Sequence, residues 1–153
     1  MTDPASAPAG YSGTPLPRKL GVKPEHRVVL VGAPTGFDLG PLPPGAHVEP
    51  VPAGATVPAG AADVTVVFCP DRATLVASFG PLKLALAPSA SLWVAWQKKA
   101  ARVPTDLDES FVREHGLACG LVDVKVCAMD RTWSGLKFVY RLADRASVSS
   151  TQA

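Results

Sequence analysis

The sequence has few cysteines, little net charge and no long apolar run, and each absence excludes a class of protein. The three cysteines, Cys69, Cys119 and Cys127, include no C-x-x-C pair, so we expect neither a disulfide framework nor a metal site. A formal net charge of +2 is too small for a surface that neutralises several phosphates, so we expect no nucleic-acid partner. No segment approaches the ~18 apolar residues of a membrane span, so we expect no membrane partner.

The first ten residues, MTDPASAPAG, lack the basic and apolar regions of a secretory signal, which predicts a cytoplasmic protein. A length of 153 residues suits one domain with a substantial core. We expect a flexible N-terminal segment at 1–14, a single α/β domain at 15–143 and a flexible tail at 144–153. Aromatic residues make up only 7% of the chain, so valine, leucine and alanine must supply most of the core.

Short apolar runs between links rich in proline and glycine predict the strands of a sheet. The runs are RVVLV at 27–31, HVEPV at 47–51, DVTVVFC at 63–69 and SLWVAWQ at 91–97. Pro50 and Pro52 favour an edge position or an early end for the second run. Trp93 and Trp96 should point to opposite faces of the fourth strand, where we expect both to pack.

The helix predicted between the third and fourth strands has a clear start and an interruption. It covers 72–86, and the Asp71 carboxylate can accept hydrogen bonds from its first turn. We expect a kink or a break at Pro81, because proline has no N–H for the helical ladder. A helical turn is also expected at 15–20, with Lys19 exposed.

A second helix is predicted over 106–116. Thr105 and Asp108 resemble a capping box at its start, and Gly116 suits the position after its last turn. A hairpin follows, in which DRTWSG joins a strand over 121–129 to LKFVYRL. The period-two rule places Val122, Val124 and Val126 on one strand face and Asp123, Lys125 and Cys127 on the other.

Strands that alternate with helices predict an α/β fold, a Rossmann-like and mostly parallel sheet with a C-terminal antiparallel hairpin. The links after the first two strands have little room for helix, so the helices on one face are reduced. The bare sheet face must then be covered by the N-terminal segment, another copy of the chain or a partner.

This order of elements resembles that of class I methyltransferases. GVKPEHRVVLVGAPTGF is similar to their first strand and glycine loop, and LALAPSASLWVAWQ to a later segment. Their donor loop, D-x-G-x-G-x-G, aligns with residues 30–36, where Leu30 replaces the acid and Pro34 the middle glycine. Val51-Pro52 stands where an acid would bind ribose. Proline removes an N–H and adds bulk at the ligand, so we expect no methyl-donor site and no cofactor.

A closer resemblance covers nearly the whole chain. AGYSGTPLPRKLGVKPEHRVVLVGAP, LWVAWQKKA and GLVDVKVCAMDRTWSGLKFVYR are similar to a short actinobacterial family of domains of unknown function. This resemblance implies a small cytosolic protein, and it supplies no activity, cofactor or catalytic residue.

Ligands of open α/β sheets bind beyond the carboxyl ends of the parallel strands. The predicted ends carry six candidate ligand-binding residues, Gly32, Thr35, Gly36, Asp71, Lys98 and Lys99. A glycine loop, a helix N-terminus and two lysines together suit an anion such as a phosphate or a nucleotide. Alternatively, the glycines form a tight turn and the lysines keep a loop soluble.

Trp133 is a candidate anchor for a protein partner, because it sits in the predicted turn with Arg131 and Lys137 nearby. Alternatively, its ring folds back over the sheet edge. Cys127 has Lys125 on its predicted face, and a lysine can lower a thiol pKa, but no spacing ties Cys127 to a histidine base. We therefore expect an inert thiol and assign no catalytic residue.

Without a nucleophile–base pair or a metal-ligand set, enzymatic activity stays uncertain and is not favoured. The leading hypothesis is a non-catalytic protein-interaction or regulatory module on a degenerate methyltransferase-like fold. It would self-associate, or bind a protein partner, through its bare sheet face. The alternative is a protein that binds a small ligand or anion at the strand ends, with or without catalysis.

Overall fold

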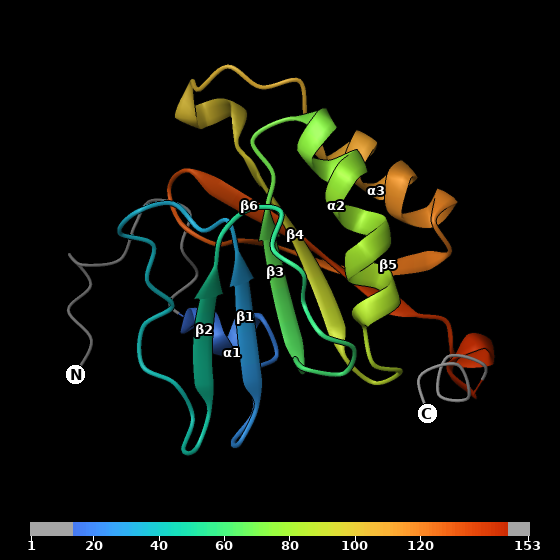
Figure 1. Ribbon diagram of the computed structural model, residues 1–153. Helices are drawn as coiled ribbons and strands as arrows, with labels where there is room; N and C mark the ends of the chain where they lie inside the picture. Colours follow the sequence, from blue (N-terminus) through green and yellow to red (C-terminus); the bar gives the residue numbers. More distant parts are fainter. Residues whose placement is uncertain (1–13, 147–153) are drawn as a thin grey trace.

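The chain folds around one six-stranded sheet, and the computed structural model describes residues 14–146 (Figure 1). In chain order the strands are β1 (Arg27–Val31), β2 (His47–Val51), β3 (Val64–Phe68), β4 (Ser91–Gln97), β5 (Leu121–Ala128) and β6 (Trp133–Tyr140). In space the order is β2-β1-β3-β4-β6-β5. The neighbouring strands β2, β1, β3 and β4 run parallel to one another, and β6 is antiparallel to both β4 and β5. The predicted α/β class with a closing antiparallel hairpin is confirmed.

The helices lie on both faces of this sheet. They are α1 (Leu16–Lys19), α2 (Arg72–Ala85), α3 (Glu109–Ala118) and the 3-10 turns η2 (Lys99–Ala101) and η3 (Leu142–Asp144). Figure 1 shows α2 and α3 against one face and α1 against the other. Within residues 14–146, no helix is long and apolar enough to cross a membrane. Most of the segments expected to be flexible, 1–14 and 144–153, lies outside the described residues.

Of the kink or break predicted at Pro81, the break is wrong, because α2 continues through this residue. Proline has no N–H to donate to the Ala77 carbonyl, and this loss normally disfavours a helix interior. The inner face of α2 buries Leu75, Phe79 and Leu82 in the core. Burial of three large side chains outweighs one missing hydrogen bond.

The start and end predicted for α3 are also wrong. The helix begins at Glu109, and the carboxylate of Asp108 accepts the N–H of Phe111 at 2.8 Å. The hydroxyl of Thr105 donates instead to the Pro70 carbonyl, so it ties the preceding loop to the end of β3. Gly116 lies inside the helix rather than after it.

Lys19 is buried at 9% exposure, contrary to the sequence prediction. Its ammonium reaches the Ala128 carbonyl at 3.4 Å, and the neighbouring Leu20 carbonyl accepts the indole N–H of Trp93 at 3.1 Å. Polar contacts therefore fix α1 across the middle of the sheet, with its end toward β5 and β6.

The sheet separates two apolar clusters. On the α2/α3 face the cluster includes Phe79, Val94, Trp96 and Phe138. On the α1 face it includes Leu20, Leu39, Phe68, Trp93 and Trp133. The two tryptophans of β4 pack on opposite faces, as predicted. The face that the sequence left bare is covered by α1 and by the loop after β1, which both belong to the predicted domain 15–143.

A β-bulge overturns the side-chain pattern predicted for β5. Asp123 pairs with Phe138 of β6, Lys125 pairs with the adjacent Lys137, and Val124 is the extra residue. The extra residue shifts the alternation by one position. Asp123 consequently lies on the α2/α3 face, whereas Lys125 lies on the α1 face.

Both outer edges of the sheet discourage the addition of another strand. In β2, the Val51 carbonyl accepts the Gly32 N–H, so the backbone of the preceding Pro50 points outward by strand alternation. Proline offers no N–H to an added strand. The β5 edge carries the bulge at Val124, which interrupts a regular ladder.

Candidate functional site

The carboxyl ends of β1, β3 and β4 lie at one edge of the sheet, because the three strands are parallel neighbours. This arrangement was predicted from the sequence, and it places the glycine loop, the start of α2 and the two lysines on the same side of the molecule (Figure 1). The contacts of each candidate residue decide whether they can form one site.

The glycine loop forms turns that use its own backbone groups. Gly32 has φ +70 and donates its N–H to the Val51 carbonyl at 2.9 Å. Gly36, with φ +85, sits in a turn that the Phe37 N–H closes on the Pro34 carbonyl at 3.1 Å. Both glycines are explained by positive φ, which other residues rarely adopt. The N–H of Gly32 is therefore already used within the sheet.

Two carboxylates occupy the N-terminus of α2. Asp71 accepts the N–H of Thr74 at 2.8 Å and its hydroxyl at 2.6 Å, which confirms the predicted cap. Both hydrogen bonds lower the pKa of Asp71, and the one from the Thr74 hydroxyl has the larger effect. Asp106 accepts the N–H of Arg72 at 2.8 Å. A third anion at this helix start would be repelled by the two carboxylates.

The two lysines after β4 contact the hairpin and the loop before α3. The Lys98 ammonium donates to the Asp130 carbonyl at 2.5 Å, in the turn between β5 and β6. Lys99 is exposed on η2. Both line an open hollow of about 360 Å³ with the acidic Asp108 and Glu109. Because both signs of charge line it, this hollow does not select for an anion.

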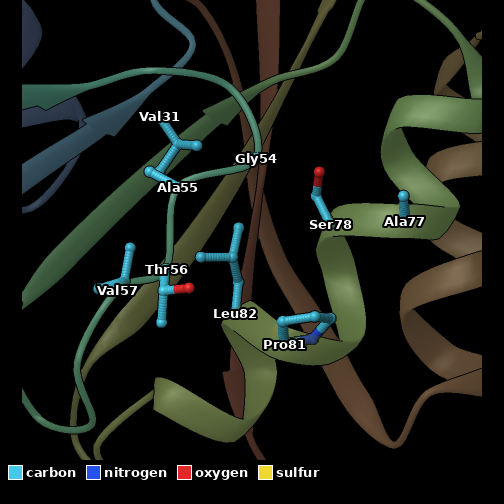
Figure 2. Close-up of a pocket in the computed structure, with 9 residues that line it drawn as sticks. All are labelled: Val31, Gly54, Ala55, Thr56, Val57, Ala77, Ser78, Pro81 and Leu82. Carbon is cyan, nitrogen blue, oxygen red and sulfur yellow. The ribbon is translucent and has the colours of Figure 1, made fainter.

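A separate cavity of about 210 Å³ lies between α2 and the loop that follows β2. Figure 2 shows its lining residues, which are Val31, Gly54, Ala55, Thr56, Val57, Ala77, Ser78, Pro81 and Leu82. No lining side chain is charged, and the hydroxyls of Thr56 and Ser78 are the polar groups. No sequence pattern indicated this cavity, because it forms where the helix-free link after β2 crosses α2.

Trp133 does not project from the hairpin turn. It is the first residue of β6, is 7% exposed, and packs edge-to-face on Phe68 with ring centroids 5.2 Å apart. Of the two alternatives predicted for Trp133, the structure shows the ring folded back over the sheet and not a projecting anchor. Arg131 is exposed in the turn, whereas Lys137 lies half-buried within β6. These three residues do not form one surface anchor.

The cysteines differ in burial and in neighbours. Burial raises the pKa of Cys69 to about 12, and Asp71 adds to this effect. Burial also raises the pKa of Cys127, although the charges of Lys19, Lys125 and Lys98 oppose this rise. Both directions agree with inert thiols.

A thiol–imidazole pair that was not predicted from the sequence lies at the end of α3. Sγ of Cys119 lies 3.6 Å from Nε2 of His115, and both residues are half-buried. The i, i+4 spacing would indicate this pair only on a helix that continues past Gly116, where the sequence predicted the helix to end. The His115 ring is packed between Phe79 and Phe111, so the pair belongs to the helix packing as well. Residues 14–146 contain no group of three metal-ligating side chains.

A solved structure similar to this chain is that of a SAM-dependent methyltransferase from Aquifex aeolicus. The TM-score is 0.55 at 16% identity, and the match covers 79% of this chain and 85% of that one. The fold is methyltransferase-like. A scan against protein-family models and a search of the curated proteins give no match. The resemblance to an actinobacterial family stays a prediction.

Proposed function

We propose that this protein is a non-catalytic binding module on a methyltransferase-like sheet, and that it associates with a second copy of itself through the outer face of α2. The observation that carries this proposal is an exposed apolar stripe along α2, which we call the α2 stripe. It consists of Ala73, Val76, Ala77, Pro81 and Leu84. Val76 is 55% exposed and Leu84 74%. A helix that is apolar on its inner and outer faces is typical of a buried helix.

The spacing of large and small residues on the α2 stripe favours a second copy as its occupant. Val76 and Leu84 are eight residues, or about 12 Å, apart on the helix. Small or compact residues, among them Ala77, Gly80 and Pro81, lie between them. If two α2 helices cross antiparallel about Gly80, Leu84 of each copy lies opposite Val76 of the other, and the small Gly80 lets the two helices approach closely. Such a surface is self-complementary, as a two-fold dimer requires.

The cavity in Figure 2 opens beside Ala77 and Pro81, within reach of this contact. Its uncharged lining suits an aliphatic side chain from the second copy. Association through the sheet edges has less support, because Pro50 and the bulge at Val124 oppose strand addition.

The non-catalytic part of the proposal is supported by the strand ends. The Gly32 N–H, the start of α2 and the Lys98 ammonium already bind groups of the chain itself. A small-ligand or anion site there, the alternative function, would have to displace these contacts.

Sedimentation velocity between about 10 µM and 1 mM tests the association, since a contact confined to one face of a single helix predicts a weak dimer. We expect the wild-type chain to dimerise with rising concentration and Val76→Glu to remain monomeric. Val124→Glu is the matched control, because Val124 is 54% exposed but lies on β5. A wild-type monomer at 1 mM, or equal disruption by both variants, would contradict the proposal.

A further inference from the structure

Three lysines from separate elements gather beside the turn that follows α1, on the face away from the α2 stripe. Lys125 and Lys137 are direct cross-strand neighbours in the β5–β6 ladder. The Lys125 ammonium donates to the Lys19 carbonyl at 3.2 Å. The Lys137 ammonium lies against Gly21, 3.4 Å from the point where a Cβ would be. Lys23 lies two residues after Gly21, close enough for its charge to act on Lys137. We call Lys23, Lys125 and Lys137 the lysine cluster.

Like charges that face each other across two strands destabilise a sheet. The pKa of Lys137 lies below its ordinary value, first because of burial and then because Lys125 and Lys23 add positive charge. Among the described residues, no carboxylate contributes in the opposite direction. The repulsion between these positive charges therefore destabilises the folded chain.

The β-bulge keeps Asp123, the carboxylate nearest to Lys125 in sequence, away from the cluster, and the carboxylate of Glu25, two residues from Lys23, lies against Gly45. Asp123 is two residues from Lys125, but the extra Val124 turns it to the other face, where it binds Arg113 at 2.9 Å. The ion pairs found within residues 14–146 involve arginines and none of the three cluster lysines.

The position of Lys125 is explained by a structural role within the fold. Lys125 binds a carbonyl at the end of α1, where a cation is favourable. Neither Lys23 nor Lys137 shares this role. The Lys137 ammonium makes no side-chain hydrogen bond or ion pair with the described residues, although it is half-buried. An uncharged side chain of the same length would pack there without repulsion.

We propose that the lysine cluster binds a phosphate group, either free phosphate or the phosphate of a small monoester. A phosphate dianion presents several acceptor oxygens and would neutralise the charge that the three ammonium groups hold together. Three lysines are too few for a nucleic-acid surface, which contacts more phosphates along a strand. This site is independent of the α2 stripe and of the proposed dimer.

Phosphate titrations at constant ionic strength, with chloride as the balancing anion, test this site by thermal shift and by 31P NMR. We expect inorganic phosphate to raise the melting temperature of the wild-type chain. We expect Lys137→Met to bind at least about tenfold more weakly, and without phosphate to melt no lower than wild type. O-phosphoserine, added in a second series, distinguishes a monoester from the free anion by its tighter binding.

Lys99→Met is the matched control, because Lys99 is an exposed lysine outside the cluster. It should retain the whole phosphate response. The proposal would be overturned by a phosphate response no larger than that to chloride, or by one that Lys137→Met and Lys99→Met reduce equally.

Discussion

Gly116 shows how tightly α3 packs on the sheet. A Cβ there would lie 2.0 Å from Cε1 of Phe138 in β6. We expect Gly116→Ala to lower the free energy of unfolding by about 1–3 kcal/mol, although alanine favours a helix more than glycine does. Urea denaturation measures this change. Glu114→Ala, at an exposed site in the same helix, should stay within about 0.5 kcal/mol of wild type. Equal stability of the two variants would refute the close contact.

Asp71 should give the stability a measurable pH dependence. Its folded-state pKa is below its ordinary value of 3.8, so its charged form stabilises the fold above that pH. The contribution is lost as the pH falls below 3.8 through the folded-state pKa. We expect Asp71→Ala to be less stable than wild type at pH 7, and this difference to shrink in the acid range.

Urea midpoints measured from pH 7 down to about pH 2 test this dependence. Asp71→Asn is the matched control, because an amide oxygen can still cap the helix but does not titrate. A difference between Asp71→Ala and wild type that stays constant down to the lowest pH would show that the carboxylate is not responsible.

Only part of the candidate site could be read from single residues. The Asp71 cap and the positions of Gly32 and Gly36 follow from local preferences, since caps and turns involve neighbours in sequence. The contact of Lys98 with Asp130 could not be predicted, because the two residues are 32 positions apart. The pair His115–Cys119 was not predicted, because it depends on α3 continuing past Gly116, where the sequence predicted the end of the helix.

The continuity of α2 through Pro81 is a property of the whole helix. We expect Pro81→Ala to raise the free energy of unfolding by about 1–2 kcal/mol. Alanine restores an N–H for the Ala77 carbonyl, and this gain exceeds the lost rigidity of the unfolded chain. Thermal and urea denaturation at low protein concentration measure the effect apart from any dimer. A destabilised Pro81→Ala chain would mean that the proline ring itself supports the packing.

The elements were predicted best where one local pattern dominates. The bounds of β1, β2 and β4 match the predicted runs, because unbroken or proline-limited apolar runs have few alternatives. The bounds of α3 and the faces of β5 were predicted wrongly. Both Thr105 and Asp108 could cap the start of α3, and Asp108 is the residue that does so. The faces of β5 depend on the bulge at Val124, which forms only when β5 pairs with β6.

For the whole molecule, the methyltransferase-like fold and the altered donor loop lead to opposite expectations about SAM. A functional site with a dissociation constant of about 10 µM would add roughly 2.7 kcal/mol of stability at ~1 mM SAM. We expect no change in melting temperature, because Pro34 offers no N–H and the Gly32 N–H is bound to Val51. A rise of several degrees would show that the loop still holds the donor.

The sequence by itself determined the strands, the α/β class and the loss of the donor motif. These features follow from local composition: β-branched runs extend, aspartates cap helices, and proline removes an N–H wherever it stands. Only the tertiary structure decided which groups meet. Contacts between distant segments buried Trp133 and Lys19, used the candidate ligand groups within the chain, exposed the α2 stripe and assembled the lysine cluster. Such contacts depend on the register and crossing of elements, which local patterns do not specify.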